Sequence, residues 1–171
     1  MRFRIDMCDV DLQLKIKEWT DEGDPLQWTR EEFSLKGKYI DYSFDSEVLM
    51  CDEVIYLRDA LDALLDGRVK EKFTIEFAEP DFIFLLSPAV RLYSEPGKVI
   101  YRDGYRDFDI DMEMRVRFWC KGGLGSNYFS MAFNRGEIQA LHTYLQLVTK
   151  EIDAADDQVA KLMSAGIIIP E

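Results

Sequence analysis

One stretch of the chain alternates apolar and polar side chains without a break from residue 108 to residue 120. Its apolar positions are Phe108, Ile110, Met112, Met114, Val116, Phe118 and Cys120. Successive side chains of a strand point to opposite faces of a sheet, so this period of two predicts a long strand with one buried and one open face. An open face is typical of antiparallel sheets. Because a mean strand has only about 5 to 6 residues, we expect this one to bend or coil.

Further strands are expected on both sides of it. Shorter alternating or apolar runs occupy residues 1–5, 10–17, 26–35, 39–44, 73–77, 82–86 and 127–133. The turn Glu79-Pro80-Asp81 joins two of these runs into a hairpin, and Asp103-Gly104 predicts another. In the run 26–35, the pair Glu31-Glu32 interrupts the alternation, which a β-bulge or an edge position would explain.

Residues 52–66 have a helical period instead. Apolar side chains recur there three and four residues apart, at Val54, Leu57, Leu61 and Leu64. This spacing places them on one face of an amphipathic helix. We expect Asp52 to cap its start and Gly67 to supply the left-handed residue that ends it.

The C-terminal region keeps the same three-four rhythm from Ile138 to Leu162. Asn134 and Glu137 have the spacing of a capping box, so a helix is expected over 135–152. The rhythm is compatible with one long helix or with two, and residues 154–157 are a plausible break. Gly166 is expected to stop the helix, and the apolar tail 167–170 either docks or frays.

The order of elements is strands, a helix, many strands and a helix, which predicts a single α+β domain over residues 1–171. We expect a twisted antiparallel sheet, or a sheet folded into two layers, packed against the central helix and the C-terminal helix. The apolar runs are shorter than the ~18 residues that a membrane span needs, and residues 1–10 lack the apolar core of a signal peptide. We therefore expect a cytoplasmic protein without a membrane partner.

The chain carries 33 acidic and 21 basic side chains, a formal net charge of −12. This charge repels phosphate backbones and disfavours a nucleic-acid partner, whereas it attracts basic proteins. Cys8, Cys51 and Cys120 share no C-x-x-C spacing, so neither a disulfide framework nor a zinc site is expected. His142 is the single histidine and is interpreted as the flank of a helix. No catalytic residues, metal ligands or cofactor are predicted.

The most unusual local pattern is an acidic row within the alternating strand. Its members, two residues apart, are Asp107, Asp109, Asp111 and Glu113. On a strand they would share one face at intervals of about 7 Å. A calcium loop needs a glycine-centred turn that this row lacks, and glycoside hydrolysis would need a cleft that the sequence does not indicate. The row is therefore either a solvated face balanced by Lys and Arg or a docking surface for a basic protein.

Trp119 follows on the polar side of the same strand, with Arg115 and Arg117. Exposed aromatic side chains beside arginine are typical of binding hot spots, so Trp119 is a candidate anchor for a protein partner. The alternative is that a helix covers this face and buries the ring.

Two segments carry a family resemblance. Leu49-Met50-Cys51-Asp52-Glu53 leads into the leucine-rich stretch 57–65, and Phe77-Ala78-Glu79-Pro80-Asp81-Phe82-Ile83-Phe84 follows it. Together with the order of elements, they resemble the WapI-like immunity proteins of bacterial polymorphic toxin systems. The resemblance implies a non-catalytic protein that binds and neutralises a cognate toxin domain in the cytoplasm of the cell that makes it. It assigns no role to an individual residue.

Two other functions remain open at this point. One is a small acidic enzyme that uses a metal held by the acidic row. The other is an oligomeric adaptor or regulatory binding protein, whose copies would associate through the stripe from Ile138 to Leu162 as coiled coils do.

Overall fold

The computed structural model describes residues 1–7, 9–22, 24–91, 107–118 and 127–170, without the side chains of residues 90, 91, 107 and 108. The described residues form two larger antiparallel sheets and three helices, which confirms the α+β class and its two-layer form. The hairpin predicted at Asp103-Gly104 lies outside these residues.

The first sheet, sheet A, has the strand order β11-β1-β2-β3-β4. Its strands are β1 (Arg2–Met7), β2 (Val10–Lys17), β3 (Trp28–Gly37), β4 (Ile40–Met50) and β11 (Ile168–Ile169). β1, β2 and β3 bury every second side chain, as the alternation in residues 10–17 predicted for β2. In β3 one of the buried positions is Glu31, so the burial pattern continues through the Glu31-Glu32 pair that interrupts the apolar pattern of the sequence. The apolar C-terminal tail docks: β11 pairs with β1, and Ile168 is fully buried.

The second sheet, sheet B, has the order β10-β9-β6-β5. It comprises β5 (Phe73–Glu76), β6 (Phe82–Ser87), β9 (Asp111–Arg117) and β10 (Tyr128–Phe133), while β7 (Val90–Arg91) and β8 (Asp107–Phe108) form a separate short pair. β5 and β6 are the hairpin predicted around Glu79-Pro80-Asp81. The inner face of sheet B buries Phe84, Met112 and Met114.

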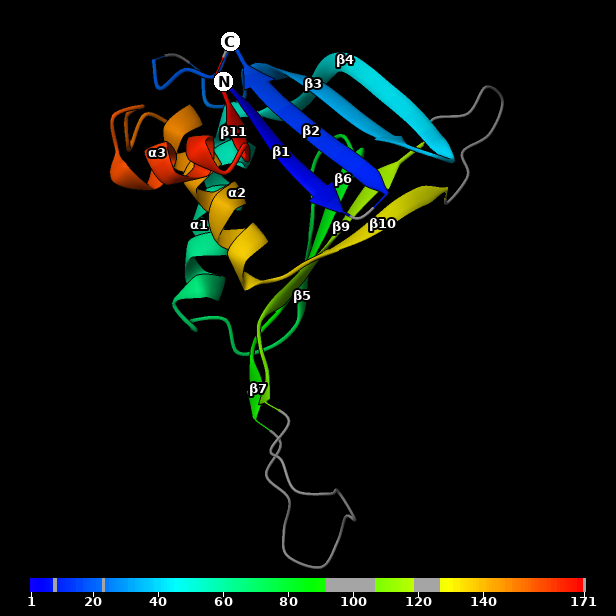
Figure 1. Ribbon diagram of the computed structural model, residues 1–171. Coiled ribbons are helices and arrows are strands. Elements are labelled where there is room, and N and C mark those ends of the chain that lie inside the picture. The colour runs from blue at the N-terminus through cyan, green and yellow to red at the C-terminus, as the bar shows by residue number, and fades with distance from the viewer. Residues whose placement is uncertain (8, 23, 92–106, 119–126, 171) are drawn as a thin grey trace, which may run out of the picture.

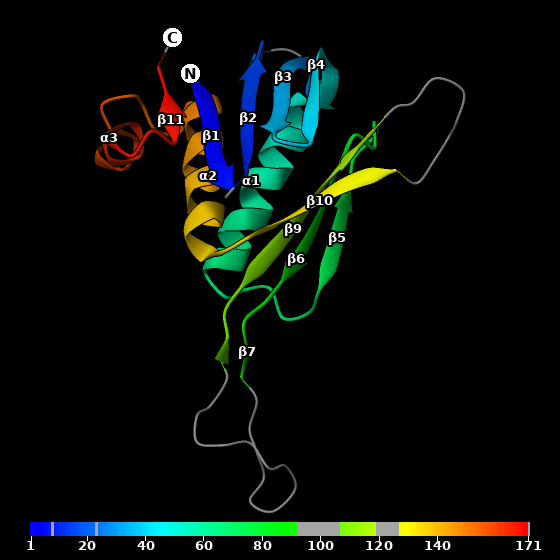
Figure 2. The same ribbon diagram turned by 45° about the vertical axis from the view of Figure 1, so that its right-hand side comes forward.

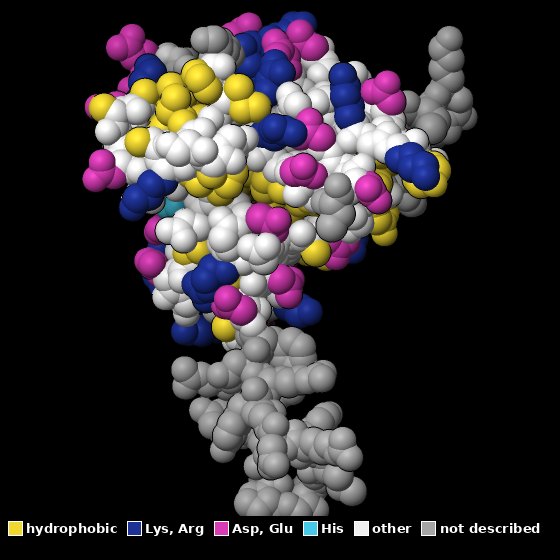
Figure 3. Space-filling model, in the orientation of Figure 1, with side chains coloured by type: hydrophobic (Ala, Val, Ile, Leu, Met, Phe, Trp, Pro, Cys, Tyr) yellow, Lys and Arg dark blue, Asp and Glu magenta, His cyan; other side chains and the backbone are white. Residues whose placement is uncertain are grey.

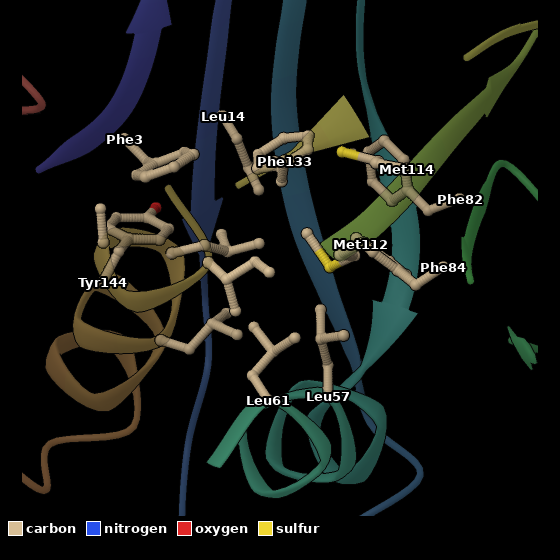
Figure 4. Packing of buried hydrophobic residues seen from close by; sticks show 14 of the residues in the cluster. Phe3, Leu14, Leu57, Leu61, Phe82, Phe84, Met112, Met114, Phe133 and Tyr144 are labelled. Carbon is tan, nitrogen blue, oxygen red and sulfur yellow. The ribbon is translucent and has the colours of Figure 1, made fainter. Parts of the chain in front are cut away.

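The helices are α1 (Cys51–Leu65), α2 (Arg135–Val148) and α3 (Asp157–Ser164). Figures 1 and 2 show α1 and α2 side by side, against the ends of the two sheets where these diverge. Tyr144 of α2 reaches sheet A, because its ring lies 5.6 Å from that of Phe3 and its hydroxyl accepts a 2.9 Å hydrogen bond from the amide of Ile16. In Figure 4, Leu57 and Leu61 of α1 point into the same core as Met112 of β9. One continuous core therefore joins both sheets and the helices.

The prediction for the start of the central helix was wrong. Met50, not Asp52, is the N-cap residue, and its amide donates to the Glu53 carboxylate at 2.9 Å. The loop between β2 and β3 supplies the other acceptors, since Cys51 N donates to Gln27 O at 2.9 Å and Asp52 N to the carbonyl of residue 25 at 3.1 Å. Tertiary contacts thus satisfy amides that a capping side chain would otherwise bind. The predicted end is confirmed, because Gly67 has a φ of +69°.

The C-terminal residues with the three-four spacing form two helices, not one. α2 ends at Val148, four residues before the predicted end, and α3 begins after Asp156, whose carboxylate accepts from the amide of Gln158 at 2.8 Å. The predicted break at 154–157 therefore marks the start of α3. The stripe side chains Ile138, Leu145 and Val159 are fully buried in the core of this chain. A coiled-coil contact between copies would have to remove them from that core.

The backbone that leads into β2 packs closely against the end of β3. A small substitution at this contact should therefore have a large effect on stability. A Cβ atom on Gly37 would lie 2.3 Å from the carbonyl oxygen of Asp9 and 3.2 Å from Cγ2 of Val10. We expect Gly37→Ala to lower the free energy of unfolding by about 1–3 kcal/mol, measured by urea titration, because backbone must move to admit the methyl group. Lys36→Ala, at the exposed neighbour, should change it by less than about 0.5 kcal/mol. Equal effects of the two substitutions would contradict this close packing.

Candidate protein-binding face

β9 is an internal strand, with β6 on one side and β10 on the other. Its inner side chains are buried in the core that both sheets share with the helices, and its outer side chains face away from this core. We call this outer surface the β9 outer face, formed by Ile83 and Leu85 of β6, Asp111, Glu113, Arg115 and Arg117 of β9, and Tyr128 and Ser130 of β10. Among the described residues, no helix lies over it. The face combines charged, aromatic and aliphatic side chains on a rigid sheet.

A chain of contacts orders the middle of this face. The Nε atom of Arg115 donates to Glu113 at 2.7 Å, and the hydroxyl of Ser130 donates to the same carboxylate oxygen. The Arg115 guanidinium also lies 4.9 Å from the ring centroid of Tyr128, a cation–π distance. The hydrogen bonds from Arg115 and then Ser130 hold the pKa of Glu113 below its ordinary value. Glu113, Arg115 and Tyr128 are thus held in place by one another.

The acidic row is not continuous, because the long strand predicted over 108–120 is interrupted. β8 ends at residue 108, Asp109 and Ile110 have no strand pairing, and β9 begins at Asp111. The carboxylate of Asp109 accepts from the amide of Ile110 at 2.8 Å and from Nε and Nη2 of Arg135 at 3.0 and 2.7 Å. Arg135 and then the Ile110 amide lower the pKa of Asp109. A side chain that bonds to its own backbone competes with strand pairing, which explains the interruption.

The remaining members of the predicted site have different positions. Asp111 is exposed at the start of β9, and no described cation forms an ion pair with it. Asp107 belongs to β8, but its side chain is not described, and Trp119 lies outside the described residues. Of the predicted set, the structure thus brings Asp111 and Glu113 together on the β9 outer face and places Asp109 beside α2.

Sequence reasoning missed Tyr128, which is 45% exposed, and the two aliphatic side chains of β6. The outward positions of β10, namely Tyr128, Ser130 and Ala132, already alternate with the buried Met131 and Phe133. That period of two could have indicated an exposed tyrosine. It could not have indicated that β9 lies beside β10 and β6 at the same time.

The outer face of sheet A has a different character, since its charges are paired. Arg2 and Lys17 both bind Glu32, at 2.8 and 2.7 Å, and Arg30 binds Asp45 at 2.6 Å. Figure 3 shows Lys and Arg side chains interspersed with Asp and Glu on the surface that it presents. Glu113 and Arg115 of the β9 outer face are paired as well, but this face also presents the exposed Tyr128 and Asp111, so it is the better candidate.

The geometry of the described residues does not support a catalytic role for His142 or a metal-binding site. His142 is half-buried between α1 and α2, with Nε2 3.8 Å from an Asp62 oxygen, and burial lowers its pKa. No three described His, Cys, Asp or Glu side chains are grouped so that they could hold a metal ion. Cys51 is a buried free thiol.

A shallow hollow of about 430 Å³ lies between β1, the start of α2 and residues 165–167. Two of its charged side chains are already engaged: Arg4 donates to Asp11 at 2.6 Å, and Glu137 accepts from the amide of Asn134 at 2.8 Å. The hollow therefore offers no convergent set of free groups to a small ligand.

Comparisons with known proteins add no second line of evidence. No protein-family model matches this chain, and no curated protein matches it in sequence. In the described part of the chain, no helix is both long and apolar enough to cross a membrane. The geometry of the β9 outer face consequently carries the functional inference.

Proposed function

We propose that this protein is a non-catalytic, cytoplasmic immunity-type protein of a bacterial toxin system, which binds and neutralises a cognate toxin domain through the β9 outer face. One observation carries the proposal: an open sheet face holds Arg115 stacked on Tyr128 beside aliphatic side chains. Arginine and tyrosine are among the residue types most enriched in binding hot spots. A pair that is already ordered loses little side-chain entropy when a partner binds.

The net charge supports a basic partner. A chain with a formal charge of −12 attracts a positively charged domain and speeds its encounter. Asp111, an exposed carboxylate at one end of the face, is then a contact for a basic group of the toxin domain. The partner would be a toxin domain with a basic surface.

No particular observation favours the two alternatives. A metal-dependent enzyme built on the acidic row would use Asp109 and Glu113, but Arg135 and Arg115 already bind these carboxylates. An adaptor assembled through the C-terminal stripe would use side chains that lie in the core.

Charge reversal at Asp111 tests the proposal. The probe is the C-terminal domain of a large secreted protein encoded directly upstream, with affinity and rates measured by surface plasmon resonance. We expect Asp111→Lys to weaken binding at least about tenfold, mainly through slower association, because an attractive charge becomes a repulsive one. The difference should shrink at high salt, which screens exposed charges.

Glu22→Lys is the matched control, because it makes the same charge change on an exposed side chain of the loop between β2 and β3. The two substituted residues lie near opposite ends of α2. Asp21, next to Glu22, binds Lys150 just after the end of α2, whereas Asp109, two residues before Asp111, binds Arg135 at its beginning. Glu22→Lys should reduce affinity far less than Asp111→Lys. Equal affinities for the two variants would refute the assignment of this face, and no binding by the unaltered chain would refute the immunity function for that toxin.

A further inference from the structure

The pairing of β3 with β4 contains a one-residue β-bulge. Trp28 lies opposite Met50, but Arg30 lies opposite Glu47, so two residues of β4, Val48 and Leu49, face Thr29 alone. The Glu31-Glu32 pair predicted a bulge or an edge position for β3, and both were wrong for this strand. β3 pairs on both sides, its buried positions alternate through Glu31, and the extra residue of the bulge belongs to β4. A bulge disrupts the ladder, and buried backbone groups at that point need other partners.

Two buried polar side chains of β3 supply those partners. Oε2 of Glu31 accepts from the amides of Val48 and Leu49 at 2.9 and 3.3 Å. The hydroxyl oxygen of Thr29 lies 2.7 Å from the carbonyl oxygen of Leu49 and 2.5 Å from Oε1 of Glu31. Both side chains have zero exposure to solvent. The bulge is therefore closed by a buried carboxyl and a buried hydroxyl.

The hydroxyl of Thr29 has one proton, but two oxygens lie within its reach. If Glu31 is ionised, Thr29 donates either to the carboxylate or to the carbonyl of Leu49, and the other oxygen loses this donor. If Glu31 carries a proton, Oε1–H donates to Thr29, Thr29 donates to Leu49, and Oε2 accepts the two amides. Only when Glu31 is protonated is there a donated hydrogen atom in every one of these contacts.

The surroundings of Glu31 also disfavour a negative charge. On β2 the opposite residue is the apolar Ile16, whose amide binds the Tyr144 hydroxyl of α2. From α1 the like charge of Glu53 acts on Glu31, and Glu53 itself accepts from the amides of Met50 and Ala78. Cys51, at the first position of α1, is a buried thiol. Burial, opposed in part by the hydrogen bonds, raises the pKa of Glu31 to about 7.

We propose that Glu31 is a proton-dependent latch: with its proton it ties the β4 bulge to β3 just before α1, and loss of the proton weakens this junction. The direction in which stability changes with pH follows from the number of protons that the folded and the unfolded chain bind. Between the unfolded pKa of 4.5 and the folded pKa of about 7, the folded chain binds more protons than the unfolded chain. Stability is therefore highest toward the acidic end of this window and falls as pH rises through about 7.

The test compares the unaltered chain with Glu31→Gln by urea unfolding at pH 6 and pH 8. Glutamine can accept from the two amides and donate to Thr29, as a protonated glutamate does, but it cannot ionise. We expect the folding constant of the variant, divided by that of the unaltered chain, to be about tenfold larger at pH 8 than at pH 6. The same ratio at both pH values would overturn the latch.

Two controls keep the result specific. Glu32→Gln removes a carboxylate from the next position, whose pKa is lowered by Lys17, and its ratio should stay constant between pH 6 and pH 8. His142 is also titratable, but burial lowers its pKa, so its contribution destabilises the fold as pH falls, which is the opposite sign. His142 is present in every variant and cancels in the ratio.

A direct measurement covers the case in which Glu31→Gln does not fold. In the unaltered chain labelled with ¹³C-glutamate, one side-chain carboxyl NMR signal should titrate with a midpoint near 7. If every folded-state glutamate titrates more than about two units below 7, Glu31 is ionised at neutral pH and the proposal fails.

Discussion

Phe82→Ala is expected to lower the free energy of unfolding by about 3–5 kcal/mol, the range for removing a buried phenylalanine side chain. Phe82 of β6 is 1% exposed. Its ring lies 5.3 Å from that of Phe33 and 5.8 Å from that of Phe44, both in sheet A. The side chain therefore connects the two sheets, and alanine would leave a cavity between them. Urea titration measures the loss as a lower midpoint.

Ile83→Ala is the control for this prediction, because the next residue of the same strand points to the outer face and is only half-buried. Its truncation should cost clearly less than that of Phe82, since it leaves no cavity between the sheets. Comparable losses at the two positions would mean that Phe82 does not hold the sheets together.

Tyr128→Ala is expected to weaken binding of the cognate toxin domain by at least about 2 kcal/mol, or roughly thirtyfold, as hot-spot aromatic residues do. This prediction rests on the proposed function. Tyr128 is 45% exposed and carries Arg115 against its ring, so its removal takes away the aromatic surface and also frees the arginine. Isothermal titration calorimetry with the toxin domain measures the loss, which should appear mainly as faster dissociation in kinetic experiments.

Tyr56→Ala provides the matched control. Tyr56 lies on the exposed side of α1 and is 55% exposed, so the same ring is removed from a comparable environment away from sheet B. Its toxin affinity should equal that of the unaltered chain. If Tyr128→Ala binds as tightly as Tyr56→Ala, the stacked Arg115–Tyr128 pair is not the anchor and another surface must bind the toxin.

Local patterns in the sequence were sufficient for most of the secondary structure. The alternation around Met112 and Met114 specifies which face of β9 is buried, because each residue reverses the direction of its side chain. The capping box Asn134–Glu137 marks the start of α2, and Gly67 marks the end of α1, because each uses only neighbouring backbone groups. The α+β class follows from the order of these elements.

The candidate site depended more strongly on contacts between distant residues. The pattern through Asp109 predicts a strand, but Arg135, 26 residues later, binds its carboxylate beside α2. The contact between Arg115 and Tyr128 requires β10 to lie next to β9 in one register. No local spacing specifies such a register, because it is selected by the fit of the whole core.

What the sequence determined by itself, then, was the local geometry: which residues form strands and helices, and which of their faces are apolar. The tertiary structure alone decided which hydrogen-bond partners the buried polar groups have. It placed Glu31 inside a β-bulge that lacked ladder partners and supplied the first amides of α1 with acceptors from a distant loop. The physical reason is that periodicity is a property of neighbouring residues. The hydration lost by a buried polar group must instead be replaced by whichever group the folded chain brings to it.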